Sequence, residues 1–202
     1  MIMYNNIINE LRRKNYEVSF FKKKEDAADY LSKEIIGRTV GFGDSQTLAE
    51  MKLNERLAAE NNVYDPLRTS GNQEFLAEAM KCMTTEVYIT SANAITVNGE
   101  ILNMDGTGNR IAASLFGHNK VYYVIGRNKI CSSIEDAINR IKNKAAPMNA
   151  KRLGLKTPCA VNGDRCYDCS SSDRICNALI IQSRKMRNID MEVVIIDEVL
   201  GY

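Results

Sequence analysis

Apolar and polar residues alternate along the chain in patterns that predict strands and helices in turn. Residues 16–21 (YEVSFF) alternate as a strand does, and residues 24–35 (KEDAADYLSKEI) carry apolar residues at helical spacing. Residues 38–42 (RTVGF) form a short strand of the buried type. A helix is predicted directly after it, over residues 46–61, with Asp44 or Ser45 as the N-cap.

The same order continues towards the end of the chain. We expect strands at residues 63–67, 86–96, 100–104, 120–126 and 191–200, with a hairpin turn at residues 97–99, and helices at residues 72–83, within 105–117, and at 133–146. Because strands alternate with helices, the pattern predicts an α/β fold with a mostly parallel sheet and helices on both faces.

The composition suits a globular protein and argues against a charge-driven partner. Of the 202 residues, 45% are hydrophobic, and 27 Lys and Arg against 25 Asp and Glu leave a net charge of +2, so we expect no nucleic-acid partner. The first residues indicate an amphipathic helix and not a signal peptide, and no segment has the roughly 18 apolar residues that span a bilayer. We therefore expect a cytoplasmic protein with no membrane partner and with reduced thiols.

Two glycine-rich loops each lead from a strand into a helix. The first, V-G-F-G-D-S-Q-T (40–47), offers Gly41, Gly43, Asp44, Ser45 and Thr47. The free N–H groups and positive dipole end of a helix start favour a phosphate or carboxylate, although a plain glycine turn capped by Asp44 or Ser45 explains this loop equally well. It is not a Walker loop, and it lacks the third glycine of the dinucleotide fingerprint.

The second loop, N-M-D-G-T-G-N-R (103–110), strengthens the prediction of a ligand site. Its candidate residues are Asp105, Gly106, Thr107, Gly108, Asn109 and Arg110. Both loops are expected at the carboxyl ends of strands, where α/β sheets bind ligands. Arg110 supplies a fork of donors for a carboxylate or phosphate, and Asp105 is an acid, a base or a turn residue.

Other single residues carry weaker signals. The only histidine, His118, precedes a strand and is interpreted as an exposed turn residue. Without a partnered histidine, no Ser-His or Cys-His catalytic pair is predicted. Lys151 and Arg152 suit a solvated helix face as well as an anion site, and Cys82 and Cys131 are interpreted as structural.

Four of the six cysteines lie in one polar stretch with the spacing C-x6-C-x2-C-x6-C. They are Cys159, Cys166, Cys169 and Cys176. The central Cys-x2-Cys pair is typical of thiolate metal sites, so zinc or a [4Fe–4S] cluster is our leading hypothesis, although the spacing matches neither the usual ferredoxin patterns nor a two-knuckle zinc site. A disulfide and four unliganded thiols remain open. We predict a helix around Cys176 that begins near Asp173, which leaves its role as a ligand open.

Several strings of residues together resemble one protein family. They are V-G-F-G-D-S-Q-T-L (40–48), the run from Ser91 to Ala113 that contains N-M-D-G-T-G-N-R, V-I-G-R-N-K-I (124–130), A-A-P-M-N-A-K-R-L (145–153), T-P-C (157–159), D-C-S-S-S-D-R-I-C-N (168–177) and I-I-D-E-V-L-G (195–201). The chain resembles the LUD domain (lactate-utilisation) family, and in particular its short stand-alone type. The resemblance begins near residue 36. We therefore divide the chain into an N-terminal helix and strand segment, residues 1–35, and an α/β domain, residues 36–202, that includes a cysteine lobe at 157–177.

The resemblance implies a Rossmann-like sheet similar to that of ribose-phosphate isomerases and CoA transferases, whose glycine loops hold phosphate, carboxylate or CoA groups. It also implies an iron–sulfur partner protein, because some members of the family oxidise lactate to pyruvate beside such subunits. That association favours an iron–sulfur cluster over zinc in the cysteine lobe.

Two functions fit these features, and the sequence leaves open whether the chain is an enzyme. The first is binding of a small anionic metabolite, such as lactate, pyruvate, a phosphorylated compound or CoA, across both glycine loops. The second is a non-catalytic module of a lactate-utilisation complex that senses metal or redox state through its cysteines. Self-association suits either function.

Overall fold

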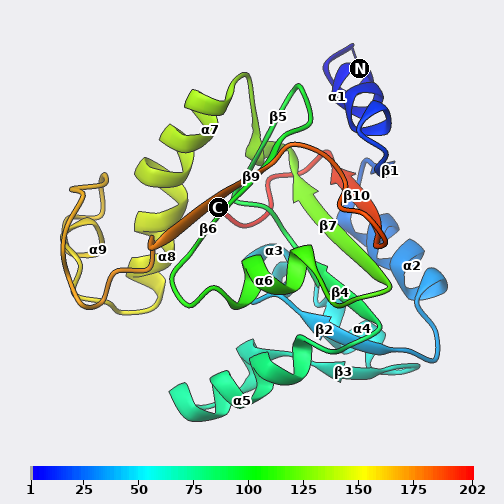
Figure 1. Ribbon diagram of the computed structural model, residues 1–202, viewed down its shortest axis with the longest axis horizontal. Helices are drawn as coiled ribbons and strands as arrows, with labels where there is room; N and C mark the ends of the chain where they lie inside the picture. Colours follow the sequence, from blue (N-terminus) through cyan, green and yellow to red (C-terminus); the bar gives the residue numbers. More distant parts are fainter. Residues whose placement is uncertain (1) are drawn as a thin grey trace.

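The centre of the protein is a parallel sheet of six strands in the order β1-β10-β7-β4-β2-β3 (Figure 1). The computed structural model describes residues 2–202, and side chains from Tyr4 onward. The strands are β1 (Glu17–Phe21), β2 (Thr39–Phe42), β3 (Asn62–Tyr64), β4 (Val87–Thr90), β7 (Lys120–Gly126) and β10 (Asp190–Ile196). Every neighbouring pair in this sheet is parallel, which confirms the predicted α/β architecture.

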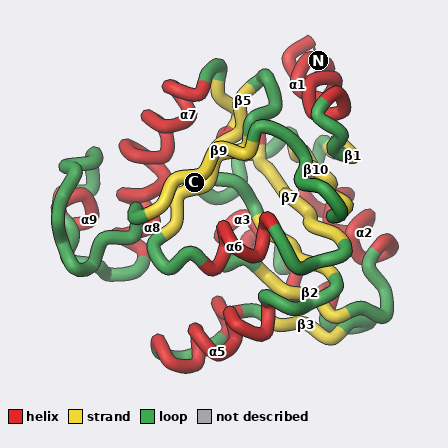
Figure 2. The backbone as a smooth tube through the Cα atoms, viewed as in Figure 1, coloured by secondary structure: helices red, strands yellow, loops and turns green. Residues whose placement is uncertain are grey.

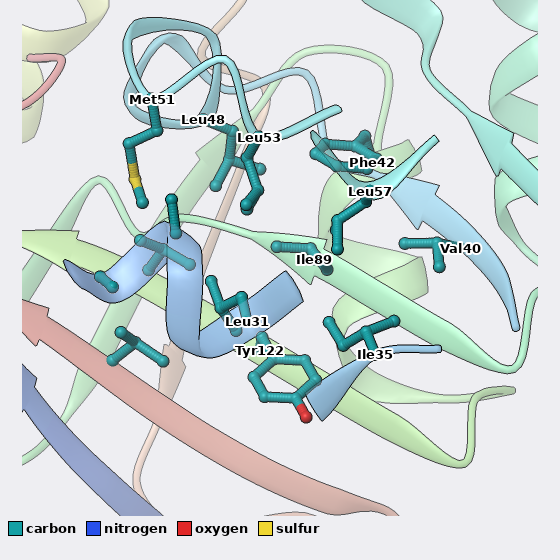
Figure 3. Close-up of a cluster of buried hydrophobic side chains, with 14 of the residues drawn as sticks. Leu31, Ile35, Val40, Phe42, Leu48, Met51, Leu53, Leu57, Ile89 and Tyr122 are labelled. Carbon is teal, nitrogen blue, oxygen red and sulfur yellow. The ribbon is translucent and has the colours of Figure 1, made fainter. Parts of the chain in front are cut away.

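Helices cover both faces of this sheet because its strands are apolar on both sides. One face packs against α2 (Lys24–Glu34), α3 (Gln46–Glu50) and α4 (Leu53–Leu57) through a buried cluster that includes Leu31, Phe42 and Ile89 (Figure 3). The other face packs against α1 (Ile2–Arg13), α5 (Asn72–Cys82) and α6 (Asn109–Leu115). The sheet is therefore the middle layer between two sets of helices.

A second sheet of four strands lies beside the first, in the order β8-β5-β6-β9. Strands β5 (Ala94–Thr96) and β6 (Ile101–Asp105) are antiparallel and joined at the predicted turn, while β8 (Ile130–Cys131) and β9 (Ala178–Gln182) flank them. Helix α7 (Ile134–Arg140) packs on this sheet through a small apolar cluster that contains Leu102 and Ile141. The chain crosses from the first sheet to the second directly after β4 and again after β7.

Two predicted helices differ in detail from the structure. The helix expected over residues 46–61 divides into α3 and α4 near Lys52, which has a left-handed φ of 50°. The helix expected at residues 133–146 continues through a π-helical segment, Ile141–Ala145, into α8 (Ala146–Arg152). Pro147 has no N–H to give to the carbonyl of Asn143, so the α-helical pattern is interrupted there.

The helix predicted around Cys176 is wrong, since that segment leads into strand β9. The backbone N–H of Asn177 donates to the carbonyl of Asp105 at 3.0 Å, and residues 178–182 continue this pairing along β6. Pairing with β6 outweighs the helical spacing, and the β-branched Ile180 and Ile181 favour the strand. The lobe before β9 is mostly loop around the short helix α9 (Pro158–Asn162) (Figure 2).

The N-terminal segment contributes an edge strand to the main sheet. Strand β1 pairs with β10 from Glu17 to Phe21, and Ile7 and Leu11 of α1 are fully buried beneath the sheet. Two 3-10 turns complete the fold, at Pro66–Arg68 and Arg127–Lys129. Within residues 2–202, no helix has the length and apolar character needed to cross a membrane.

Replacing Leu31 with alanine should lower the free energy of unfolding by about 2–5 kcal/mol, because the side chain is fully buried between α2 and the sheet. Lys33→Ala, on the exposed side of the same helix, should change it by less than about 0.5 kcal/mol. Urea unfolding followed by circular dichroism measures both, and equal effects would contradict the packing described.

Candidate active site

A cleft of about 720 Å³ opens at the carboxyl ends of β2 and β4. From β2 the chain continues to β3 on one side, whereas β4 leads to β7 on the other, so the cleft lies where the connections change direction. This is the position at which open α/β sheets bind ligands. The polar side chains that line it are Asp44, Ser45, Gln46, Thr69, Asn72, Ser91, Asn93, Asp105, Thr107, Asn109, Arg110, Lys129, Asn149, Ser172, Asp173, Arg174 and Tyr202.

The first glycine loop places Asp44 in the cleft wall. Gly43 passes so close to β4 that an added Cβ would lie 2.5 Å from Thr90 Oγ1, so its small size serves packing. Asp44 follows with a left-handed φ of 39°, and burial raises the pKa of its carboxyl group. Its Oδ1 accepts no hydrogen bond from the described residues, and Arg152 Nη2 is 3.7 Å away.

The second loop is shaped by Asp105, which acts as the cap of helix α6. Its Oδ2 accepts hydrogen bonds from the backbone N–H groups of Arg110 at 3.0 Å and Ile111 at 3.2 Å. The start of this helix therefore carries its own carboxylate. The Arg110 side chain donates to the carbonyl of Met104 at 2.6 Å, and its Nε lies 3.7 Å from Asp105 Oδ2.

Lys129 is one of the cleft residues for which the sequence predicted no role. It follows β7 in the 3-10 turn Arg127–Lys129 and is 3% exposed. Its Nζ lies 2.8 Å from Thr47 Oγ1 and 2.9 Å from Ser91 Oγ, both hydroxyl oxygens. Burial, aided by the nearby guanidinium groups of Arg140 and Arg110, lowers the pKa of Lys129 from 10.5 to about 7.

Arg140 of α7 lies behind this lysine and contacts both chain crossings. Its Nη1 donates to the carbonyl of Asn93 at 2.5 Å and its Nε donates to the carbonyl of Asn128 at 2.9 Å. Its Nη2 is buried and has no hydrogen-bond partner among the described residues. The site therefore holds buried positive charge next to the cleft.

The structure brings most of the predicted loop residues together in the cleft. Those that line it are Asp44, Ser45, Asp105, Gly106, Thr107, Asn109 and Arg110. Gly41 and Gly43 instead pack against neighbouring elements, and Thr47 contacts Lys129 from behind. Lys129 lies shortly after the predicted strand at 120–126 and within the string V-I-G-R-N-K-I (124–130), which carries part of the family resemblance but assigns this lysine no role.

The interpretation of His118 as an exposed turn residue is wrong. The imidazole is 4% exposed, its Nδ1 lies 2.6 Å from the carbonyl oxygen of Thr85, and its ring stacks on Tyr88 with centroids 5.0 Å apart. Burial lowers the pKa of His118. It is a packed core residue outside the cleft.

The cysteine lobe forms one wall of the cleft through residues 172–175. Arg174 donates to the carbonyl oxygens of Cys169 at 2.7 Å and Cys176 at 3.2 Å. Burial raises the pKa of the Cys176 thiol, and Cys166 and Cys169 act on it in the same direction with smaller contributions. Cys159, in α9, contacts the hydroxyl of Thr157 at 3.3 Å.

A metal centre needs several ligand side chains grouped around one point. All six cysteines are free thiols, and among the described residues no group of three or more Cys, His, Asp or Glu side chains is arranged to hold a metal ion. The donor set itself, four thiols in one segment, has the chemistry of a zinc or iron–sulfur site. The positions of these sulfurs would have to change for them to bind one ion together.

These observations define an α/β protein with a polar, lysine-containing cleft at the switch point of its sheet. The chain belongs to the LUD domain family, whose model matches residues 4–196. Its fold is similar to that in the crystal structure of a DUF162 family protein from Deinococcus radiodurans, with a TM-score of 0.53, 9% sequence identity and 96% of each chain covered. No curated protein matches the chain.

Replacing Lys129 with methionine should change how stability depends on pH. Folded Lys129 has a pKa near 7, whereas the unfolded residue keeps a value near 10.5, so between these values the unfolded chain binds more protons. Stability of the wild type relative to Lys129→Met should therefore rise from pH 7 to pH 10, by about 1.4 kcal/mol per pKa unit of difference. Urea unfolding at several pH values measures this, and a constant difference would contradict it.

Proposed function

We propose that this protein binds a small organic anion in the cleft. The observation that carries the proposal is the amino group of Lys129, which lies in the cleft wall close to Arg110 and Arg140 and forms no ion pair with a carboxylate of the described residues. Asp105 lies near Arg110, but Arg140 forms no ion pair with a described residue, and its buried Nη2 has no partner. A bound anion would offset the charge of Arg140 and stabilise the protonated form of Lys129.

The size and lining of the cleft support a metabolite as the ligand. A volume of about 720 Å³ is in the range of small-molecule sites, and the hydroxyl and amide groups of Ser45, Ser91 and Asn109 can orient polar substituents. Membership of the lactate-utilisation family favours a short organic acid such as lactate or pyruvate over a phosphorylated or CoA ligand. The raised pKa of Asp44 and the lowered pKa of Lys129 favour a chemical role over simple storage of the ligand.

Replacing Arg110 with glutamine should weaken binding of the anion by at least about tenfold, because it removes one charge-assisted donor from the cleft. Isothermal titration with lactate, pyruvate, inorganic phosphate and CoA in turn measures this. Arg13→Gln, which removes an equal charge from the exposed side of α1, is the matched control and should bind as the wild type does. The proposal fails if none of the four compounds binds, or if both variants bind equally.

We propose as a second candidate that the lobe carries a metal or iron–sulfur centre and gives the protein a sensing or assembly role beside an iron–sulfur partner. The four thiols of one loop-rich segment support this role, since thiolates are the ligands of zinc and iron–sulfur sites. Cys159 is the fourth thiol of the lobe and the remaining candidate ligand.

Anaerobic purification followed by analysis for iron, zinc and sulfide tests this second candidate. The wild type should contain metal, with visible absorption if the metal is in an iron–sulfur cluster, and Cys166→Ser or Cys169→Ser should remove it. Cys131→Ser, which changes a half-buried thiol outside the lobe, should retain it. A protein free of all three elements, or equal metal content in every variant, would rule the centre out.

A further inference from the structure

The surroundings of Lys129 hold its amino group in a reactive form. The Thr47 hydroxyl donates to the carbonyl of Leu200 at 3.2 Å, and the Ser91 hydroxyl donates to the carbonyl of Ala92 at 3.4 Å. Each hydroxyl oxygen therefore accepts from Lys129, at 2.8 and 2.9 Å. A neutral amine has two hydrogens, and these two acceptors use both, so its lone pair stays free.

The lone pair has somewhere to act, because Lys129 lines the cleft although it is 3% exposed. Gly201 closes the rear of this pocket: a Cβ at that position would lie 2.7 Å from Thr47 Oγ1 and 3.4 Å from Lys129 Nζ. Protein atoms thus occupy the space behind the amino group. A ligand can therefore reach the amino group of Lys129 from the cleft.

We propose that the amino group of Lys129 forms an imine with the carbonyl carbon of an anionic aldehyde or keto acid bound in this cleft. This inference rests on the proposed anion site and adds to it the reacting atom and the class of substrate. The anionic group would lie near Arg110, and the carbonyl group would face Lys129. A hydroxy acid such as lactate, which has no ketone or aldehyde group, binds in the same cleft but cannot form an imine.

The step balances without an oxidant or a reductant. The nitrogen lone pair attacks the carbonyl carbon and forms the C–N bond, while the carbonyl oxygen takes up a proton to give a hydroxyl group. That hydroxyl group leaves as water after a second protonation, the nitrogen loses its two hydrogens as protons, and a C=N bond remains. Hydrolysis reverses the sequence.

Asp44 is the cleft residue suited to supply the proton to the departing hydroxyl group. Its carboxyl group lines the cleft, its Oδ1 is buried without a hydrogen-bond partner among the described residues, and burial favours its protonated form. Tyr202, whose buried hydroxyl also lacks a described partner, lies in the same wall. Both groups line the same cleft as Lys129.

Reductive trapping tests the proposal. The full chain is incubated at pH 7 with sodium cyanoborohydride and either pyruvate or glycolaldehyde phosphate, and the modified lysines are located by peptide mass spectrometry. Hydride adds to the imine carbon and fixes the ligand on nitrogen. The two arms distinguish a carboxylate from a phosphate as the anionic group, and uncharged glycolaldehyde shows how much the anion contributes.

We expect Lys129 to be labelled at least about tenfold faster than Lys142, an exposed lysine in the π-helical segment, by at least one of the anionic probes. At pH 7 an amine with a pKa near 7 is about half neutral, while an ordinary lysine is neutral in fewer than about one molecule in a thousand. Lactate should protect Lys129 and leave labelling of Lys142 unchanged. Lys129→Met should remove the fast label.

Labelling of Lys129 that is absent, or no faster than that of Lys142, with both anionic probes would overturn the proposal. The site is mapped on the wild type, so the result does not depend on whether Lys129→Met folds. If lactate binds by calorimetry and Lys129 is not labelled, the anion site stands and the imine is excluded. If no anion binds and no fast label appears, both proposals fail.

Discussion

The guanidinium group of Arg140 joins the two points at which the chain leaves the six-stranded sheet. One crossing follows β4 and the other follows β7, and Arg140 donates to a backbone carbonyl in each, at Asn93 and Asn128. Ser91 and Lys129 lie on these same crossings, within two residues of the clamped carbonyls. The distance of 2.9 Å between Ser91 Oγ and Lys129 Nζ therefore depends on Arg140, which does not itself line the cleft.

The clamp has an electrostatic effect as well as a geometric one. Because Arg140 is cationic and lies close to Lys129, it opposes a second positive charge there, and burial between the sheets acts in the same direction. The apolar clusters on both faces of the sheet keep water away from the β strands that lead into the site. One arrangement thus positions the amine and lowers its pKa.

The sequence predicted the parallel sheet and both glycine loops because those features depend on local periodicity and on turn residues. It did not predict the second sheet as a separate layer, because β8 has only two residues and the segment of β9 was predicted to begin as a helix. Both become strands by pairing with β5 and β6. Lys129 was missed for a related reason. A lysine after a strand is ordinary in sequence, and only tertiary contacts show that Thr47, Ser91 and Arg140 surround it. His118 was misread because its burial against Tyr88 arises from contacts between distant segments.

The glycines of the two loops show why a glycine-rich motif does not by itself identify a phosphate site. A glycine that lets backbone approach a phosphate and one that lets two segments pack have the same appearance in sequence. Gly43 is of the second kind, and so is Gly106, where an added Cβ would lie 2.9 Å from the Cα of Ile175. The proposed anion site accordingly depends on side-chain charge more than on the glycines.

The contact between Gly106 and Ile175 has a thermodynamic consequence. Asn177 donates from its backbone to the carbonyl of Asp105 and from its side chain to that of Gly106, so the segment around Cys176 and the loop that carries Arg110 form one unit. If oxidation of the Cys176 thiol, or its binding to a metal, moved this segment, it would also change the free energy with which the cleft binds its ligand. Linkage is reciprocal, so a cleft ligand that preferred one position of the loop would change the free energy of a reaction at Cys176 by the same amount.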